Sequence, residues 1–177
     1  RNMAKRYRCN TSHGQKIENY ALQIFDAMKK FHGLGTRERL LLQIASILHD
    51  CGKFISLRDS SACAYNIIMA TEIIGLSHAE REIVAEVVRC NLDAFRYGEG
   101  SIRAGKLTAM LRLANAMDRS HHGRLDDGKL QVKGNKLIIS TSYAGNLALE
   151  TMAVEDKADF FEEMFGIRPE IRQKRRV

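Results

Sequence analysis

Two histidines and an aspartate stand where helices are expected to bring them together. His13 opens an apolar stretch near the start of the chain, and the pair His49-Asp50 closes a second one just before Gly52. Neutral imidazoles and a carboxylate that converge from different helices can hold a divalent ion, which activates water against a phosphate ester. The sequence therefore predicts the first half of a metal-dependent phosphohydrolase site.

The remaining ligand of such a site is expected in the middle of a later helix, in a setting such as Leu-Ala-Asp. Here Asn115 follows Leu-Ala, so an amide stands where a carboxylate is needed. Losing a full negative charge weakens the attraction for a dication by more than one hydrogen bond restores. We therefore predict a vestigial or weak metal site made of His13, His49, Asp50 and Asn115. Asp118, one turn later, could substitute for the lost carboxylate or serve as a helix cap.

The apolar pattern predicts the helices that position these residues. Apolar residues recur at spacings of three and four in the first helix, and the second is apolar on most sides, which places it centrally. Ser77 and Glu80 form a capping box that marks the start of the fourth helix. A loop is expected at 97–101. The expected helices span 11–31, 36–50, 62–74, 77–91 and 106–120.

After Gly123 the spacing of apolar residues changes from the helical pattern to the alternation of a strand. Leu130 and Val132 alternate with polar residues, and a Gly-Asn turn at 134–135 precedes a run of β-branched residues, which is typical of a hairpin. A short strand at 147–150, a helix at 155–165 and a last strand that Pro169 places on an edge complete the pattern. We predict a mainly α protein: an HD-domain-like helical bundle, residues 1–124, followed by a small α+β unit, residues 125–177, with the order hairpin, strand, helix, strand.

Composition points to an anionic partner. The 177 residues carry a net charge of +7 and the sequence pI is about 9.4. Such a positive charge favours nucleic acid, polyphosphate or a nucleotide as the partner, but the absence of Trp and the scattered Tyr residues argue against single-stranded nucleic acid. No apolar stretch suits a membrane span or a signal peptide, and the four cysteines form no Cys-x-x-Cys pair, so we expect a cytoplasmic protein with reduced thiols.

Three stretches resemble the C-terminal half of the Ppx/GppA family, the exopolyphosphatases and guanosine pentaphosphate phosphohydrolases. They are LQIASILHDCGKFIS at 42–56, the segment from IGLS at 74–77 to VR at 88–89, and LRLANAMDRSH at 111–121. This chain has Cys63 where many members carry a histidine, and Cys90-Asn91 where they carry Tyr-His. With Asn115, up to three potential ligand positions are altered.

The resemblance implies that hydrolysis belongs to an N-terminal pair of actin-like domains that use magnesium. We find no glycine-rich phosphate loop between a strand and a helix in this chain, so we assign it no catalytic residue and expect it to be inactive alone. We predict no firmly bound cofactor beyond a weak divalent metal. The expected partners are those N-terminal domains, polyphosphate or another polyanion, and a second copy in a homodimer, but no membrane.

Basic side chains are the candidates for holding the polyanion, because guanidinium groups match phosphate oxygens geometrically. Most of them cluster at the end of the fifth helix, beside the flexible Gly123. The predicted phosphate-binding residues are Arg89, Arg112, Arg119, His121, His122 and Arg124.

Three functions remain open from the sequence. The favoured one is an accessory C-terminal region of an exopolyphosphatase-like enzyme that contributes polyphosphate binding and dimerisation. The second is a functional metal-dependent HD phosphohydrolase that acts on a nucleotide or a phosphate ester. The third is a regulatory module, without activity of its own, that senses a guanosine tetra- or pentaphosphate signal.

Overall fold

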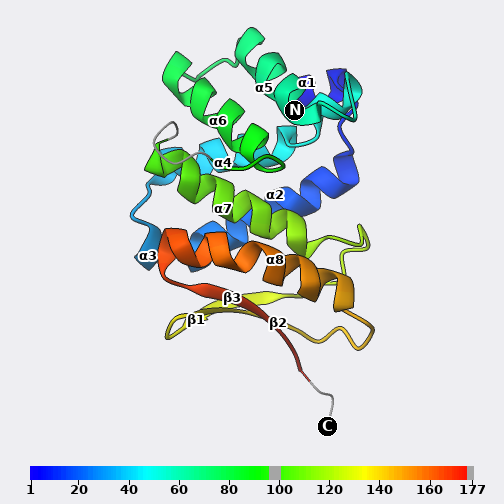
Figure 1. The fold of residues 1–177 in the computed structure, drawn as a ribbon, viewed down its shortest axis with the longest axis vertical. Coiled ribbons are helices and arrows are strands. Elements are labelled where there is room, and N and C mark those ends of the chain that lie inside the picture. The colour runs from blue at the N-terminus through cyan, green and yellow to red at the C-terminus, as the bar shows by residue number, and fades with distance from the viewer. Residues whose placement is uncertain (96–100, 175–177) are drawn as a thin grey trace.

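The computed structural model describes residues 1–95 and 101–174. The loop expected at 97–101 therefore lies outside the described residues, except for Ser101. Figure 1 shows a helical body above a small sheet. The elements are α1 (Asn2–Arg6), α2 (Thr11–Ala27), α3 (Lys29–His32), α4 (Thr36–Leu48), the 3-10 turn η1 (Cys51–Phe54), α5 (Ser60–Ala70), α6 (His78–Cys90), α7 (Ile102–Met117), β1 (Lys129–Lys133), β2 (Lys136–Thr141), α8 (Ala148–Phe165) and β3 (Arg168–Gln173).

Helix α7 is the centre of the fold. It packs against α2, α4, α6 and α8, and Figure 1 shows it crossing the middle of the molecule above α8. Its apolar residues point to several sides, so Leu107, Met110 and Leu113 are all buried. The mainly helical fold with a small α+β unit is confirmed. Within the described residues, no helix is long and apolar enough to cross a membrane.

Local capping fixes several helix boundaries. The predicted start of α6 is confirmed, because the Ser77 hydroxyl accepts the Glu80 N–H at 3.2 Å and the Glu80 carboxylate accepts the Ser77 N–H at 2.9 Å. Helix α7 begins earlier than predicted, since the Ser101 hydroxyl accepts the Ala104 N–H at 3.1 Å. It ends at Met117, three residues before the predicted end.

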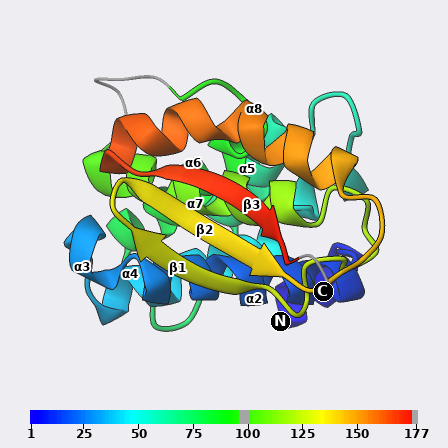
Figure 2. The ribbon, with the colours of Figure 1, turned by 90° about the horizontal axis from the view of Figure 1, so that it is seen from below.

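The sheet has the order β1-β2-β3 and covers the underside of the helices (Figure 2). Strands β1 and β2 pair antiparallel as the predicted hairpin, with Gly134 in the left-handed conformation at φ 61°. Strand β3 pairs parallel to β2, so Pro169 lies on an edge strand as predicted. Leu137 and Ile139 join the same apolar cluster as the helical part. The boundary between residues 124 and 125 stays a prediction.

The strand predicted at 147–150 is wrong, because these residues form the start of α8, which begins seven positions before the predicted helix at 155. The Asn146 side chain accepts the Ala148 N–H at 2.8 Å and so satisfies one free donor of the first turn. Leu147 and Glu150 are buried, and Val154 continues their side of the helix. A four-residue segment with three apolar residues could not distinguish this arrangement from a strand.

His32, the last residue of α3, is fully buried. Its ring lies 3.0 Å from the Phe25 carbonyl through Nε2, and its Nδ1 lies 2.8 Å from the Leu34 backbone nitrogen. This network assigns the neutral tautomer in which Nε2–H donates and Nδ1 accepts. Burial lowers the pKa of His32 below its ordinary value. Protonation of Nδ1 would therefore remove one hydrogen bond and leave a charge in the core.

We expect the free energy of unfolding to decrease below pH 6.5, the ordinary pKa of His32. Because the pKa of His32 is lower in the folded protein, the unfolded chain binds a proton more readily. The contribution of neutral His32 to stability is therefore fully present at higher pH and is lost as the pH falls. The contribution is at most about 1.4 kcal/mol per pH unit. Urea unfolding at several pH values measures this decrease in the free energy of unfolding. His32→Leu should be less stable but show a shallower pH dependence, and an unchanged slope would contradict this role.

Candidate functional site

His13 and Asp118 form a buried pair that joins the start of α2 to the end of α7. His13 Nδ1 lies 2.8 Å from the Asp118 carboxylate, whose other oxygen accepts the Gly123 N–H at 2.8 Å. Burial raises the pKa of Asp118, but the bonds from His13 and Gly123 outweigh this effect and leave the pKa below its ordinary value. A carboxylate bonded to Nδ1 leaves the lone pair on Nε2 of His13, as in metal-bound histidines.

His49 is held in a similar orientation at the end of α4. Its Nδ1 lies 2.7 Å from the Ser46 carbonyl oxygen, which fixes Nδ1–H as the donor. Its Nε2 is buried, makes no hydrogen bond within the described part of the chain, and lies 3.5 Å from the Asp50 carboxylate. The rings of His13 and His49 meet edge to face with centroids 5.3 Å apart. Burial lowers the pKa of His49, so the imidazole is neutral at pH 7.

The carboxylate of Asp50 is already engaged by a cation. The Lys53 ammonium, from the η1 turn, lies 2.6 Å from Asp50 Oδ1. Burial raises the pKa of Asp50, but nearby His49 and the bond from Lys53 together lower it by more. The pKa therefore lies below its ordinary value, and the carboxylate is ionised at neutral pH. Lys53 therefore supplies positive charge at the carboxylate that sequence reasoning assigned to a metal ion.

His121 joins the same group of side chains. Its ring stacks on His13 with centroids 3.8 Å apart and an interplanar angle of 10°. Residue 121 has φ 60° and Gly123 has φ 63°, so the chain turns sharply after α7 and brings this histidine back over α2. We call His13, His49, Asp50, Asp118 and His121 the histidine cluster. His121, predicted as a phosphate ligand, thus lies against a predicted metal ligand.

The histidine cluster does not fit a bound divalent ion as it stands. Across residues 1–95 and 101–174, no three His, Cys, Asp or Glu side chains are arranged to hold a metal. Magnesium prefers oxygen ligands, yet the Asp50 carboxylate is bonded to Lys53 and the Asp118 carboxylate to His13 and Gly123. The free Nε2 of His49 and the Nε2 of His13 are the features that still suit a metal.

Asn115, the fourth predicted metal ligand, lines a groove between α7 and α8. This α7–α8 groove has a volume of about 570 Å³. Arg112 and Arg119 line it from α7, and Asn91 lines it from the end of α6. The residues contributed by α8 are Leu149, Met152, Ala153, Asp156 and Lys157.

Arg112 is fixed in one orientation at the wall of the groove. Its Nε donates to the Cys90 carbonyl at 2.8 Å and its Nη2 to the Asp93 carbonyl at 2.5 Å. The guanidinium also stacks on the Phe160 ring, 4.6 Å from the centroid. Arg119 is exposed and has no ion pair with any residue that the structure describes. The groove thus presents one immobilised guanidinium and one that is free to bind.

The other predicted phosphate ligands lie apart from the groove. Arg89 pairs with Glu86 at 2.7 Å. Arg124 donates to the Asn146 carbonyl at 2.7 Å and lies 3.7 Å from the buried Glu150 carboxylate. His122 is exposed and makes no hydrogen bond in the described part of the chain. Arg89 and Arg124 are therefore already neutralised by acidic side chains.

Sequence reasoning missed Lys53 and Lys157. Lys53 carried a usable signal, because it follows His49-Asp50 within one helical turn. Lys157 carried none, since a lysine on the surface of a helix is common, and only the docking of α8 on α7 brings it to the groove.

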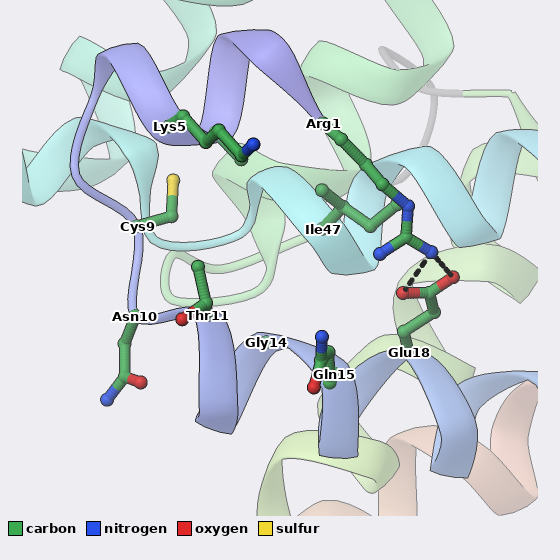
Figure 3. A pocket seen from close by; sticks show the side chains of 10 residues that line it. Arg1, Lys5, Cys9, Asn10, Thr11, Gly14, Gln15, Glu18 and Ile47 are labelled. Atoms are coloured by element: carbon green, nitrogen blue, oxygen red, sulfur yellow. Dashed lines mark hydrogen bonds and ion pairs between the residues drawn. The ribbon is translucent and has the colours of Figure 1, made fainter.

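A second hollow lies between α1, α2 and α4 (Figure 3). It measures about 130 Å³ and is mostly apolar. The Arg1 guanidinium reaches both oxygens of Glu18, at 3.0 and 3.3 Å, and Gln43 donates to the same carboxylate at 2.7 Å. The charges of Arg1 and Glu18 are thus paired with each other across this hollow.

Comparison with known proteins identifies a related family. The sequence model described as Ppx/GppA phosphatase, domain III, matches residues 1–156. The match includes the histidine cluster, the α7–α8 groove up to Asp156, and the β1–β2 hairpin. A search of curated proteins found no match.

Proposed function

Since the chain belongs to the Ppx/GppA phosphatase family and corresponds to its domain III, we propose that it is a polyanion-binding accessory region of an exopolyphosphatase-like enzyme. In this proposal the region binds polyphosphate and supports a dimer, while the hydrolytic reaction takes place in N-terminal actin-like domains that use magnesium. The observation that carries the proposal is the gathering of Arg112, Arg119 and Lys157 along one groove.

The groove suits a chain of phosphates for two reasons. Arg119 is exposed and unpaired within the described residues, so it can bind a phosphate without first breaking an internal ion pair. Arg112 is held in place by the Cys90 and Asp93 carbonyls, so its conformational entropy has already been lost on folding. Asp156, which pairs with Lys157 at 2.6 Å, offsets part of the positive charge.

The histidine cluster has a structural role in this proposal. The His13–Asp118 bond ties the first long helix to the end of α7, and the stacked His121 fixes the turn that follows. Lys53 provides the positive charge beside Asp50. The cluster therefore maintains the positions of α2, α4 and α7, on which the groove depends, without holding a metal ion.

The proposed partners are the N-terminal domains and a second copy of the chain. Exposed apolar side chains lie at the end of η1 and directly after it: Phe54 is 49% exposed, Ile55 60% and Leu57 81%. Neighbouring apolar side chains on a surface are typical of a protein contact. They support an interface at this end of the molecule.

A calorimetric titration with long-chain polyphosphate tests the function. We expect saturable binding at low ionic strength that weakens about 20- to 40-fold between about 50 and about 200 mM salt, because about three cations exchange their counterions for phosphate. A neutral polymer of the same length serves as the control. The absence of binding at low salt, or binding that salt leaves unchanged, would contradict the proposal.

The unpaired Nε2 of His49 favours one second candidate, a divalent-metal phosphohydrolase of the HD type acting on a nucleotide or phosphate ester. Elemental analysis of the protein after purification from metal-supplemented medium distinguishes the two candidate functions. The accessory function predicts much less than one metal ion per chain. One ion per chain, together with a phosphatase activity that His49→Ala abolishes, would support the second candidate instead.

A further inference from the structure

Strand β1 forms one edge of the sheet, and its outer side carries unpaired backbone groups. Among the described residues β1 pairs with β2 alone, and Figure 2 shows it at the margin of the sheet. The two-residue turn closes on the pair Lys133–Lys136, which makes this pair a hydrogen-bonded one, and such pairs recur at every second residue of an antiparallel ladder. The backbone N–H and C=O groups of Leu130 and Val132 therefore point away from β2.

The opposite edge of the sheet, formed by β3, is a poorer template for a further strand. The Arg168 N–H donates to the Asn135 carbonyl at 2.8 Å, and the Lys174 N–H donates to the Thr141 carbonyl at 2.9 Å. Since these even-numbered residues face β2, Pro169 faces outward, where it supplies no N–H group. The β1 edge thus has a complete set of donors and acceptors, and the β3 edge does not.

The side chains of β1 divide between the two faces of the sheet. Leu130 and Val132 are half-buried and pack against the apolar core, whereas Lys129, Gln131 and Lys133 are exposed. Neither lysine has an ion pair within the part of the chain that the structure describes. A strand added beside β1 would therefore meet apolar side chains on its inner face and two unpaired ammonium groups on its outer face.

Positive charge dominates the exposed face of the sheet beside β1. Lys133 lies directly opposite Lys136 on β2, and like charges in such a pair destabilise a sheet. The Glu170 carboxylate bonds to Lys136 at 2.6 Å and to Arg172 at 2.7 Å, so it offsets charge on the β3 side of this face. Acidic side chains beyond the outer edge of β1 would offset the charge that remains there.

A second copy of the chain does not suit this edge. Antiparallel pairing of two β1 strands uses the outward groups of both Leu130 and Val132 only when the register is centred on Gln131. In that register Lys129 of each copy lies opposite Lys133 of the other, and both pairs repel. The two lysines therefore oppose self-pairing and favour an acidic strand.

We propose that the free edge of β1 binds an extended acidic segment of a partner protein as a fourth strand of the sheet. Two alternate apolar residues of the segment pair with Leu130 and Val132 through backbone hydrogen bonds and extend the core. Acidic residues on either side of them lie opposite Lys129 and Lys133. The segment therefore has the pattern acidic-apolar-polar-apolar-acidic. This inference goes beyond the proposed function, because it concerns β1 and a protein ligand rather than the α7–α8 groove and polyphosphate.

Fluorescence anisotropy with labelled peptides tests the inference on the whole 177-residue chain. The probe contains Glu-Val-Thr-Val-Glu between glycine-serine flanks, and a control peptide has lysine in place of both glutamates. We expect the glutamate peptide to bind at least about tenfold more tightly at low ionic strength, because two attractive cross-strand pairs replace two repulsive ones. Lys129→Glu/Lys133→Glu changes exposed side chains only and should reverse this preference.

A second control separates strand pairing from charge attraction. Methylation of both valine nitrogens of the glutamate peptide removes two N–H donors and keeps the charges, so it should weaken binding at least about tenfold. Amide hydrogen exchange followed by NMR gives a readout at single residues. The amides of Leu130 and Val132 should exchange rapidly in the free protein and at least about tenfold more slowly with saturating peptide, whereas that of Gln131 should change little.

Three outcomes would overturn the inference. The first is equal affinity for the glutamate and lysine peptides, or no binding of either. The second is a methylated peptide that binds as tightly as its parent, which would show attraction by charge alone. The third is slow exchange at Leu130 and Val132 before any peptide is added, which would show that a second copy already covers the edge. The polyphosphate titration is independent of all three, so the proposed function stands or fails separately.

Discussion

Gly52→Ala is expected to lower the free energy of unfolding by at least about 3 kcal/mol, because the backbone of α5 leaves no room for a side chain. A Cβ atom at this position would lie 1.8 Å from the Ser60 carbonyl oxygen and 2.7 Å from the Ala64 nitrogen. Backbone atoms cannot rotate away as a side chain can, so η1 and α5 would have to separate. Urea unfolding followed by circular dichroism measures the loss.

Gly14→Ala is the matched control. Gly14 lies in the first turns of α2, and a Cβ atom there would meet nothing within 4 Å. Alanine is a better helix former than glycine, so this variant should be neutral or more stable by up to about 1 kcal/mol. Equal effects of the two substitutions would show that the close approach at Gly52 does not matter for stability.

Asp118→Ala is expected to cost about 3 kcal/mol, since it leaves two buried donors without an acceptor. The carboxylate is 1% exposed and bonds both to His13 and to the backbone N–H of Gly123. Asp118→Asn keeps one acceptor oxygen and should lower the free energy of unfolding by less. Chemical denaturation of both variants gives the two values.

The control for Asp118 is a carboxylate at the surface. Asp26 bonds to Arg39 through two hydrogen bonds of 2.8 Å, but the Asp26 side chain is 56% exposed and the Arg39 side chain 38%. Asp26→Ala should therefore cost less than about 1 kcal/mol. A loss at Asp118 no larger than the loss at Asp26 would contradict the structural role of the histidine cluster.

Features that depend on neighbouring residues could be predicted from the sequence. The Ser77–Glu80 capping box, the β1–β2 hairpin and the edge position of Pro169 each follow from local chemistry, and the structure confirms them. The strand predicted at 147–150 was wrong because a short apolar segment has no distinctive period. The second helix was predicted to run to residue 50, just before Gly52, yet α4 already ends at Leu48, and the reason for glycine at position 52 is its close contact with α5.

The candidate site was only partly predictable, because it depends on contacts between distant helices. The pattern placed His13 and His49 on buried helix faces, and the structure brings their rings together. The sequence pattern could not reveal that His13 bonds to Asp118, 105 positions later, or that Lys157 reaches the groove from α8. Asn115 was assigned from the family motif alone, and the structure places it at the groove.

The central claim is that the α7–α8 groove, rather than positive charge in general, binds polyphosphate. The most direct measurement compares polyphosphate titrations of two double variants that each remove two positive charges. Arg119→Ala/Lys157→Ala changes the groove, whereas Lys129→Ala/Lys133→Ala changes exposed lysines of β1. We predict that the groove variant binds at least about tenfold more weakly and the β1 variant within about twofold of the wild type. Equal losses in both variants, or a larger loss in the β1 variant, would contradict the account.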